Sequence, residues 1–573
     1  MKFANIIVDI SHEKLDRPFG YIIPKELEDK ISIGTQIVIP FGKGNREITG
    51  YVIEITDKPS FDINKMKYII RANEGAATVE KQLIELAWWI KKEYSCTMNQ
   101  ALKTVIPVKK KIKNIQKKTI TLNISEEEAE EKILKYKKSN AKAKVRLLQE
   151  LKDIKHMSKE LVVDKLNISP STLKALESTG DILIEIENSY RNPVNFNNLE
   201  RYDIILNEQQ KAVADGIKKT MDYKKSEKAN VHLIYGITGS GKTEVYMDII
   251  DKTIHDGKQA IVLIPEIALT YQTVKRFTRR FKDKVSIINS KLSAGEKYDQ
   301  FERAKRGEIS IIIGPRSALF TPFENLGLIV IDEEHEGAYK SENVPKYHAR
   351  EVAAKLCNIT GATLVLGSAT PSLESYFNAQ TGKYKLHRLT SREKGKLAQV
   401  SVVDMRKELK NDNKSMFSME LKQLINDRLE KKQQTMLFIN RRGYAGFVSC
   451  RECGEAVKCP HCDVTLKAHN NGKMVCHYCG YEEPIPRLCP KCGSKYIAGF
   501  GIGTQKVETM IKKEFPQAKV LRMDFDTTSR KGGHEEILSA FANHQADILV
   551  GTQMIVKGHD FPDVTLVGIL AAD

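Results

Sequence analysis

The stretch Gly236-Ile-Thr-Gly-Ser-Gly-Lys-Thr243 is a glycine-rich loop between two apolar segments. The run Val231–Tyr235 before it predicts a strand, and the run Glu244–Ile250 after it predicts a helix. Glycines let successive backbone N–H groups surround phosphate oxygens, and the N-terminus of a helix adds partial positive charge. This order predicts a nucleotide-phosphate site made of Gly236, Ile237, Thr238, Gly239, Ser240, Gly241, Lys242 and Thr243.

The second half of this site is predicted at Asp332-Glu-Glu-His335, which follows the apolar run Leu326–Ile331. A carboxylate at the end of a buried parallel strand can share a Mg²⁺ ion with the loop, where Lys242 binds phosphate and Thr243 binds the metal. We therefore expect ATP and Mg²⁺, with Asp332 at the metal, Glu333 as the base that activates water, and His335 as a coupling residue. The alternative is that these acids only cap a following helix.

The composition of the chain indicates a partner of opposite charge. The 573 residues carry a net charge of +18, with 41% hydrophobic and 29% charged residues. Several folded domains and a polyanionic partner are expected, although a basic housekeeping protein fits the charge too. No signal-like start and no apolar run of about 18 residues is present, so we expect a cytoplasmic protein without membrane contact.

The first part of the chain predicts a small β-domain. Short apolar runs at Ile6–Ile10, Tyr21–Pro24, Gln36–Pro40 and Gly50–Ile55 are separated by turn residues. A helix that contains Trp88 and Trp89 follows, and both tryptophans are expected in a core rather than on a base-stacking surface.

A lysine-rich run at residues 103–118 is either a solvated linker or a contact to a nucleic-acid backbone, and the sequence leaves both open. Helical segments follow it up to residue 180, and the run Ile182–Ile186 predicts a strand. Ser169 fits a helix N-cap, Pro170 the first turn and Gly180 the end of that helix. This order is typical of a winged helix, which either contacts DNA or serves only as a spacer or protein contact.

Two parallel sheets are predicted in the rest of the chain. Strand-like runs at Ala260–Ile264, Ile309–Ile313, Leu326–Ile331 and Thr363–Leu366 alternate with helical segments, which indicates a doubly wound sheet. Upstream, Gln210 is expected to read the adenine edge, with Gln209 as the reserve. The runs Gln434–Asn440, Lys519–Met523, Asp547–Val550 and Thr565–Leu570 predict a second sheet, and ATP is expected between the two.

Eight of the ten cysteines form Cys-x-x-Cys pairs, which indicates two structural zinc sites in a reducing compartment. The 13 residues between Cys462 and Cys476 suit two facing knuckles, whereas the five between Cys453 and Cys459 are few for one site. The spacing therefore predicts a nested arrangement, with Cys459, Cys462, Cys476 and Cys479 in the inner site and Cys450, Cys453, Cys489 and Cys492 in the outer site.

The ordered motifs resemble those of superfamily 2 helicases, and more specifically the PriA family of replication-restart helicases. The resemblance rests on the loops described above and on Pro265–Thr270, Arg316–Phe320, Tyr347–Arg350, Asn440–Tyr444, Gly551–His559 and the cysteine cluster. It covers essentially the whole chain. It implies the same nested zinc sites, and it implies that Arg316 and Lys557 contact DNA.

The resemblance also implies a function. PriA-like proteins bind branched DNA at stalled forks, unwind it 3′ to 5′, help to reload the replicative helicase and interact with single-strand-binding protein. Their 3′-end pocket corresponds here to Phe19, Gly42 and Lys67, with Gly20 where the family has an acidic residue. A bacterial monomer is expected that binds forked and single-stranded DNA and works with primosome and helicase-loading proteins.

The resemblance predicts a continuation beyond Asp573, with a Gln-x-x-Gly-Arg-x-Gly-Arg motif whose arginine reaches the γ-phosphate. We therefore expect the chain to be a fragment or a truncated product. Two rivals follow: a fork-binding scaffold with little ATP turnover, and an RNA helicase, against which the Asp-Glu-Glu-His box and the zinc insertion argue.

The expected fold is multidomain α/β with two RecA-like lobes. The predicted parts are an N-terminal DNA-binding β-domain at 1–105, a basic linker at 106–124, a winged helix at 125–192, lobe 1 at 200–390, and lobe 2 at 391–573 with the zinc insertion at 448–496.

Overall fold

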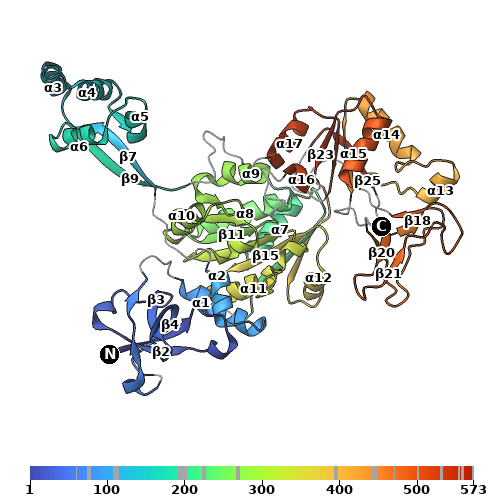
Figure 1. Cartoon of the computed structure of the whole chain (residues 1–573), viewed down its shortest axis with the longest axis horizontal. Helices are drawn as coiled ribbons and strands as arrows, with labels where there is room; N and C mark the ends of the chain where they lie inside the picture. The colour runs from blue at the N-terminus through green and yellow to red at the C-terminus, as the bar shows by residue number, and fades with distance from the viewer. Residues whose placement is uncertain are drawn as a thin grey trace. The chain divides into compact units, whose positions relative to one another are not determined.

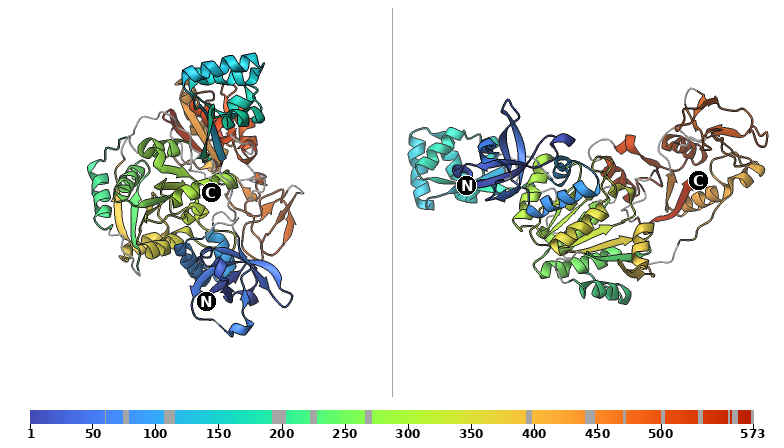
Figure 2. Two further views of the ribbon diagram at one scale, coloured as in Figure 1. Left: turned by 90° about the vertical axis from the view of Figure 1, so that its left-hand side faces the viewer. Right: turned by 90° about the horizontal axis from the view of Figure 1, so that it is seen from below.

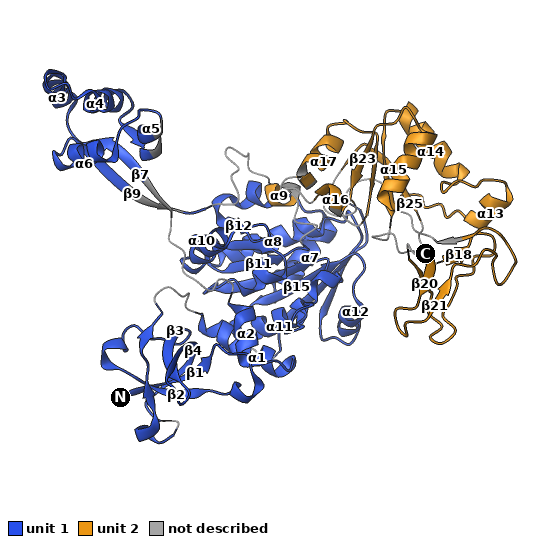
Figure 3. Ribbon diagram, in the orientation of Figure 1, with its two compact units in different colours: residues 1–266, 277–393 blue, residues 267–276, 394–573 orange. Residues whose placement is uncertain are grey.

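The chain divides into two compact units, which are described separately (Figure 3). Unit 1 comprises residues 1–266 and 277–393, and unit 2 comprises residues 267–276 and 394–573. The computed structural model describes residues 1–59, 61–73, 79–106, 115–191, 203–221, 228–265, 271–392, 398–439, 448–469, 472–499, 503–528, 533–552, 555 and 561–570. Within these residues no helix combines the length and the apolar character that a membrane crossing requires.

Unit 1 begins with a six-stranded sheet in the order β5-β2-β1-β4-β3-β6. Strands β2, β3 and β4 of this sheet are labelled in the blue part of Figure 1, near the N-terminus. Its strands are β1 (Lys2–Val8), β2 (Phe19–Ile23), β3 (Gln36–Phe41), β4 (Arg46–Thr56), β5 (Lys67–Tyr68) and β6 (Arg71–Ala72). The four longer strands were all predicted. Alternate residues of these strands, such as Ile37 and Ile39, form a separate small core.

Two helices, α1 (Lys81–Glu93) and α2 (Met98–Val105), follow this sheet. Their apolar faces share one core with the following α/β lobe, and Trp89 packs against that core. The expectation for Trp88 is wrong, because this residue is 38% exposed and Lys91 Nζ lies 5.2 Å from its ring centre. Neighbouring side chains point about 100° apart around a helix, and of the two tryptophans it is Trp89 that is turned toward the core.

The next segment combines helices with a three-stranded antiparallel sheet in the order β8-β7-β9. Its elements are β7 (Ile115–Leu122), α3 (Glu126–Lys138), α4 (Lys142–Ile154), β8 (His156–Ser158), α5 (Lys159–Asp164), α6 (Pro170–Ser178) and β9 (Ile182–Ser189). Ser169 caps α6 with Pro170 in its first turn, and Gly180 has a φ of +72°. These local predictions are confirmed.

Strand β7 corrects the predicted linker at 106–124, because residues 115–122 pair with β9 along their whole length. The lysines of this run hid a strand in which Ile120 is fully buried. Lys118, two residues earlier, lies on the same face as Ile120 and is half-buried, so that face is only partly covered there. Residues 107–114 of the predicted linker lie outside the described part of the chain.

Lobe 1 contains a seven-stranded parallel sheet in the order β12-β13-β11-β14-β15-β10-β16. The strands are β10 (Asn230–Gly236), β11 (Gln259–Leu263), β12 (Val285–Ile287), β13 (Ile311–Gly314), β14 (Leu326–Asp332), β15 (Thr363–Ser368) and β16 (Lys385–Leu389). The two edge strands, β12 and β16, were not predicted.

The lobe 1 helices are α7 (Glu208–Lys218), α8 (Lys242–His255), α10 (Ala294–Lys305), α11 (Ala349–Thr360) and α12 (Leu373–Gln380), with short 3₁₀ turns at Arg316–Phe320 and Gly337–Tyr339. Helix α9 (Tyr271–Phe281) begins with residues assigned to unit 2 and ends with residues of unit 1. Ile329 and Ile331 of β14 share a core with Leu356 of α11, and α8 contributes no residue to that core. Helices lie on both faces of this sheet, as in a doubly wound fold (Figure 2).

Unit 2 contains a second parallel sheet in the order β23-β24-β17-β25. Its elements are α13 (Met405–Lys410), α14 (Met419–Glu430), β17 (Gln434–Ile439), α15 (Thr504–Glu514), β23 (Val520–Met523), α16 (Phe525–Thr528), α17 (Gly533–Ala542), β24 (Ile548–Gly551) and β25 (Val564–Leu570). All four strands of this sheet were predicted.

A cysteine-rich insertion separates β17 from α15, and its described residues form only short strands. These are β18 (Val448–Cys450), β19 (Lys467–Ala468), β20 (Lys473–Val475), β21 (Glu482–Pro484) and β22 (Ile497–Gly499). They form two small antiparallel sheets. Strands this short cannot bury much apolar surface.

Candidate nucleotide site and zinc centres

The glycine-rich loop joins β10 to the N-terminus of α8, as the sequence predicted. Gly239 and Gly241 have φ angles of +78° and +76°, a region that side chains disfavour. A Cβ on Gly241 would lie 2.0 Å from Nε2 of Gln210. The loop also buries Ser240 Oγ without a hydrogen-bond partner among the described residues. A tight glycine cradle with an unsatisfied hydroxyl at a helix N-terminus fits a phosphate chain.

Lys242 and Thr243 begin α8 and are both half-buried. The Nζ of Lys242 donates a hydrogen bond to the carbonyl oxygen of Gly236, at 2.9 Å. This contact holds the ammonium group over the loop, which is where a phosphate-binding lysine has to be.

The predicted carboxylates lie at the end of β14, beside the loop. Burial and the charge of Glu333 raise the pKa of Asp332 to about 6, while the positive charge of Lys242 opposes that shift. The hydroxyl of Tyr246 donates to Asp332 Oδ1 at 3.0 Å. The fold therefore places Lys242 and both acids in one electrostatic environment, and an added cation would remove the penalty of two neighbouring negative charges.

Sequence reasoning missed Tyr246, which lies one helical turn after Lys242 in α8. A Cβ on Gly367 would lie 1.5 Å from the Tyr246 hydroxyl. Glycine at the start of the Gly367–Thr370 loop is therefore required for the tyrosine to reach Asp332. The only sequence signal was a glycine at the end of a strand, which does not identify its partner.

His335 joins the acidic segment to the same loop. Its Nδ1 lies 2.7 Å from Ser368 Oγ, which also accepts a hydrogen bond from the backbone N–H of Thr370 at 2.9 Å. Nδ1 of His335 lies 3.5 Å from Glu333 Oε2 as well. The structure thus brings His335 and the Gly367–Thr370 loop together, while their coupling role stays a prediction.

The two glutamines proposed for adenine occupy different environments. Gln210 is buried, accepts a hydrogen bond from the N–H of Asn207, and donates to the carbonyl of Ser240 in the phosphate loop at 3.0 Å. Gln209 instead bonds to Thr390 and Ser391, directly after β16. Adenine reading stays a prediction, and both side chains already anchor parts of lobe 1.

Three of the predicted DNA contacts lie together in the N-terminal sheet. Lys67 Nζ donates to the carbonyl of Gly42 at 2.8 Å, and the neighbouring Phe41 packs edge-on against Phe19, with ring centres 5.2 Å apart. Arg316 donates to the carbonyl oxygens of Ala338 and Lys340. Lys557 lies outside the described residues.

The nested zinc prediction is confirmed. The inner tetrad is Cys459, Cys462, Cys476 and Cys479, and the outer tetrad is Cys450, Cys453, Cys489 and Cys492. Within each tetrad all sulfur atoms lie within 4.8 Å of one another. Cys459 Sγ and Cys479 Sγ are 3.6 Å apart, close to the separation of about 3.8 Å that tetrahedral Zn–S bonds of about 2.3 Å imply.

The backbone around each cysteine pair prepares it for metal. A residue with positive φ follows every pair, namely Gly454, Asp463, Gly480 and Gly493. At Cys476 the backbone N–H groups of Cys479 and Tyr478 lower the thiol pKa to about 7. Since N–H donors favour the thiolate, and the thiolate is the metal ligand, the two tetrads fit two zinc ions.

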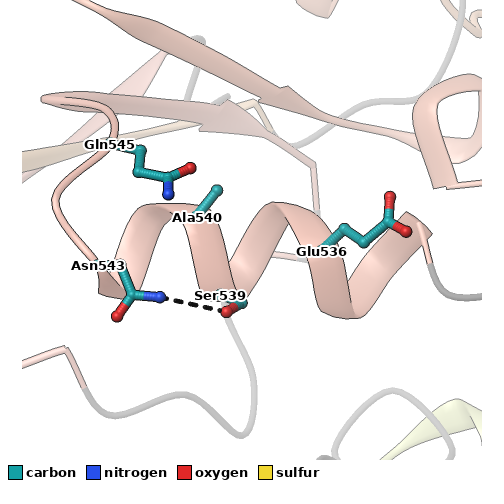
Figure 4. Close-up of a pocket in the computed structure, with 5 residues that line it drawn as sticks. All are labelled: Glu536, Ser539, Ala540, Asn543 and Gln545. Carbon is teal, nitrogen blue, oxygen red and sulfur yellow. Dashed lines mark hydrogen bonds between the residues drawn. The ribbon is translucent and has the colours of Figure 1, made fainter.

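A separate hollow lies on α17, in unit 2 (Figure 4). It is lined by Glu536, Ser539, Ala540, Asn543 and Gln545, and Asn543 Nδ2 donates to Ser539 Oγ at 3.3 Å. None of the predicted site residues lines it.

Three family models match different parts of the chain. The 3'DNA-binding domain (3'BD) of PriA matches residues 5–107, the DEAD/DEAH box helicase model matches residues 207–378, and the PriA DNA helicase Cys-rich region (CRR) domain matches residues 459–484. These regions contain the N-terminal sheet, the nucleotide site and the inner cysteine tetrad.

Curated relatives match over the whole chain. Replication restart protein PriA of Bacillus subtilis (strain 168) is 39% identical over 643 residues, which cover 100% of this chain and 79% of that protein. PriA of Chlamydia muridarum is 37% identical over 589 residues, which cover 100% of this chain and 76% of that protein. Among solved structures, RecG bound to a three-way DNA junction matches with a TM-score of 0.38 and 18% identity, over 64% of this chain and 38% of RecG.

The family models, and the relatives that match the whole of this chain, agree with the motifs of lobe 1 and with the cysteine tetrads. A helicase domain implies ATP and Mg²⁺, and the tetrads imply two zinc ions. The chain therefore belongs to the PriA family of replication restart proteins, and it is a DNA helicase and ATPase.

Proposed function

We propose that this chain is an ATP-dependent helicase that moves 3′ to 5′, recognises stalled or branched replication forks and initiates primosome assembly for replication restart. The observation that carries the proposal is the juxtaposition of Lys242 with Asp332 and Glu333 in a chain whose residues 5–107 match a 3′ DNA-binding domain. An ATPase site and a DNA-end domain in one chain suit an enzyme that must find a fork before it consumes ATP.

The proposed chemistry assigns one role to each residue around the loop. The N–H groups of residues 236–243 and the ammonium of Lys242 hold the phosphates, and Thr243 and Asp332 hold the metal ion. A bound Mg²⁺ ion supplies positive charge that neutralises the charge developing on the phosphates. Glu333 orients and deprotonates the attacking water. His335 couples the nucleotide site to the Gly367–Thr370 loop through its contact with Ser368.

The proposed DNA contacts start with the 3′ end. Phe19, Gly42 and Lys67 are close enough to form one small pocket in the N-terminal sheet, and Arg316 is proposed to contact the single strand. The net charge of +18 favours binding along the DNA backbone. The predicted domain boundaries are kept in this proposal, except that the linker ends before Ile115, where β7 begins.

The remaining partners are also proposals. A bacterial, cytoplasmic monomer would meet forked and single-stranded DNA together with single-strand-binding protein, and it would pass the fork to primosome and helicase-loading proteins. The names of the relatives support restart of replication as the setting.

The test measures ATP hydrolysis and unwinding by the 573-residue chain. Forked DNA with a free nascent 3′ end is compared with the same fork carrying a 3′-phosphate, and Lys242→Ala is the inactive control. We expect hydrolysis that the fork stimulates, weaker stimulation by the blocked end, and unwinding of partial duplexes only when the single-stranded tail permits 3′-to-5′ movement. Fork binding without stimulated hydrolysis would overturn the proposal and favour a scaffold.

A further inference from the structure

Glu334 lies between Glu333 and His335 in the acidic segment. Its side chain is completely buried, and its Oε2 lies 3.0 Å from Nη1 of Arg350, whose side chain is only 8% exposed. Arg350 stands in the first turn of α11, after the long loop that follows the acidic segment. A carboxylate buried this deeply needs a charged partner and further hydrogen bonds.

The remaining hydrogen bonds come from the start of α12, just after the Gly367–Thr370 loop. The N–H of Ser372 donates to Glu334 Oε1 at 2.7 Å, and the hydroxyls of Ser372 and Ser375 donate to Oε2 at 3.1 and 2.8 Å. Arg350 Nη1 donates to the same two hydroxyl oxygens at 2.6 and 2.9 Å. Both serine hydroxyls therefore donate and accept, and the buried carboxylate has partners on both oxygens.

This network fixes the backbone beside the proposed catalytic base. Glu333 has a φ of +48°, a left-handed conformation that a non-glycine residue keeps only when its surroundings hold it. The next residue supplies that restraint, since the N–H of Glu334 donates to the carbonyl of Gly367 at 3.1 Å and its side chain is held by Arg350 and α12.

We propose that Arg350 and Glu334 are positioning residues for ATP hydrolysis, which hold Glu333 in the conformation that directs its carboxylate to the attacking water. The inference rests on the proposed role of Glu333. Its physical basis is that a buried ion pair contributes little net stability compared with apolar residues of similar size, whereas its geometry specifies one arrangement. The arrangement specified here joins the acidic segment to α11 and α12.

The first test compares kcat and KM for ATP in the full chain with forked DNA. Because a small misplacement of a catalytic group can cost about 10²-fold in rate, we expect Arg350→Met to lower kcat by about that factor with KM for ATP nearly unchanged. Glu333→Gln should show the same pattern. Arg350→Lys keeps the charge but not the planar fork, and its kcat should fall between those of Arg350→Met and the unchanged protein. Lys355→Met, which removes a cation elsewhere on α11, is the matched control and should leave kcat unchanged.

A double variant separates positioning from stability. Glu334→Met/Arg350→Met replaces the pair by apolar side chains, which should recover the melting temperature that either single change lowers. The double variant should nevertheless keep the low kcat, because Ser372 and Ser375 then lose their acceptor. Recovery of both the melting temperature and kcat would overturn the proposal, since the pair would then serve only stability.

Hydrogen exchange gives a readout that does not depend on turnover. The amides of Glu334 and Ser372 should exchange at least about tenfold faster in Arg350→Met than in Lys355→Met. Arg350 holds the Glu334 side chain, which accepts the bond from the Ser372 amide and restrains the backbone whose amide donates to Gly367. Equal exchange in the two variants would overturn the proposal. If the unchanged chain hydrolyses no ATP, the proposed function fails, and exchange alone decides whether Arg350 positions the acidic segment.

Discussion

Lobe 1 and the cysteine-rich insertion are stabilised by different means. Lobe 1 has a seven-stranded sheet with helices on both faces, and its core contains strand residues such as Ile329 and Leu364. The insertion has strands of two or three residues, and four of the eight buried residues in its core are cysteines. A core of that size cannot offset the entropy of folding without its metal ions.

The comparison shows two ways in which a sequence can encode a site. In the insertion the cysteines that would bind zinc also make up half of the buried core. The residues that define the metal sites therefore also determine the fold. In lobe 1 the catalytic candidates contribute little to the core, and a separate framework brings Lys242 and Asp332 together. Changes at the lobe 1 site should therefore affect activity without unfolding, whereas changes at the cysteines should unfold the insertion.

The largest expected effect is that of zinc removal. Structural zinc sites contribute apparent binding free energies on the order of 10–16 kcal/mol, so a strong chelator should unfold the insertion and expose it to proteolysis. Both tryptophans of the chain lie in α1, so tryptophan fluorescence reports on unit 1 and should not change. Cys476→Ser should lower the zinc content, while Cys357→Ala, which alters a buried cysteine in lobe 1, should not. A change in tryptophan fluorescence on chelation would show that the stability of unit 1 also depends on the zinc ions.

A smaller effect is expected for the catalytic base. Glu333→Gln should lower the ATP turnover number by about 10²–10⁴-fold, the usual contribution of a general base, because glutamine cannot accept the proton. Its melting temperature should stay within about 2 °C of the unchanged protein, since a mainly polar change outside the core usually alters stability by less than about 0.5 kcal/mol. Steady-state kinetics and a thermal melt on the same sample test both statements. A large loss of stability would mean that lobe 1 also depends on its site residues.

A core substitution tests whether lobe 1 and the insertion are stabilised independently. Leu364→Ala removes a fully buried side chain of β15 and should lower the free energy of unfolding of unit 1 by about 2–5 kcal/mol. The measurement is urea denaturation followed by tryptophan fluorescence. Met474→Ala in the zinc-loaded insertion is the counterpart, and it should leave that curve unchanged. Equal shifts in the two variants would contradict independent stabilisation.

The smallest effect concerns pH. Burial, reinforced by His387, lowers the pKa of His232 to about 3, and the two rings lie 2.9 Å apart, from Nδ1 of His232 to Nε2 of His387. The unfolded chain binds a proton near pH 6.5, whereas folded His232 stays neutral. The contribution of His232 to the free energy of unfolding is therefore fully present above pH 6.5. It falls as the pH drops toward 3, by at most about 1.4 kcal/mol per pH unit.

The measurement compares fluorescence-detected melting at pH 7.5 and pH 5.5 in the unchanged chain and in His232→Gln. The loss of stability between these values should be smaller in the variant, because glutamine does not titrate. His255→Gln, at the end of α8, is the control and should behave like the unchanged chain. Equal losses in all three proteins would show that other groups cause the pH dependence.

Features whose geometry is local could be predicted from the amino-acid sequence. The phosphate loop, the strand before it and the cysteine knuckles each depend on neighbouring residues with fixed conformational needs, such as glycine at positive φ or paired thiols. The acidic segment was also identified, because a carboxylate after a buried strand lies at the ligand edge of a parallel sheet.

Contacts between residues far apart in the chain could not be predicted in this way, because they depend on how the elements pack. Strand β7 was hidden because it carries lysines and, among its described side chains, only Ile120 is fully buried. The edge strands β12 and β16 lack the long apolar runs of the central strands. Tyr246 reaches Asp332 and Arg350 reaches Glu334 because separate helices pack against one sheet, and no pattern in a single segment encodes such a pair. Local conformation follows from the nearest residues in the chain, whereas long-range pairing follows from the packing of the whole core.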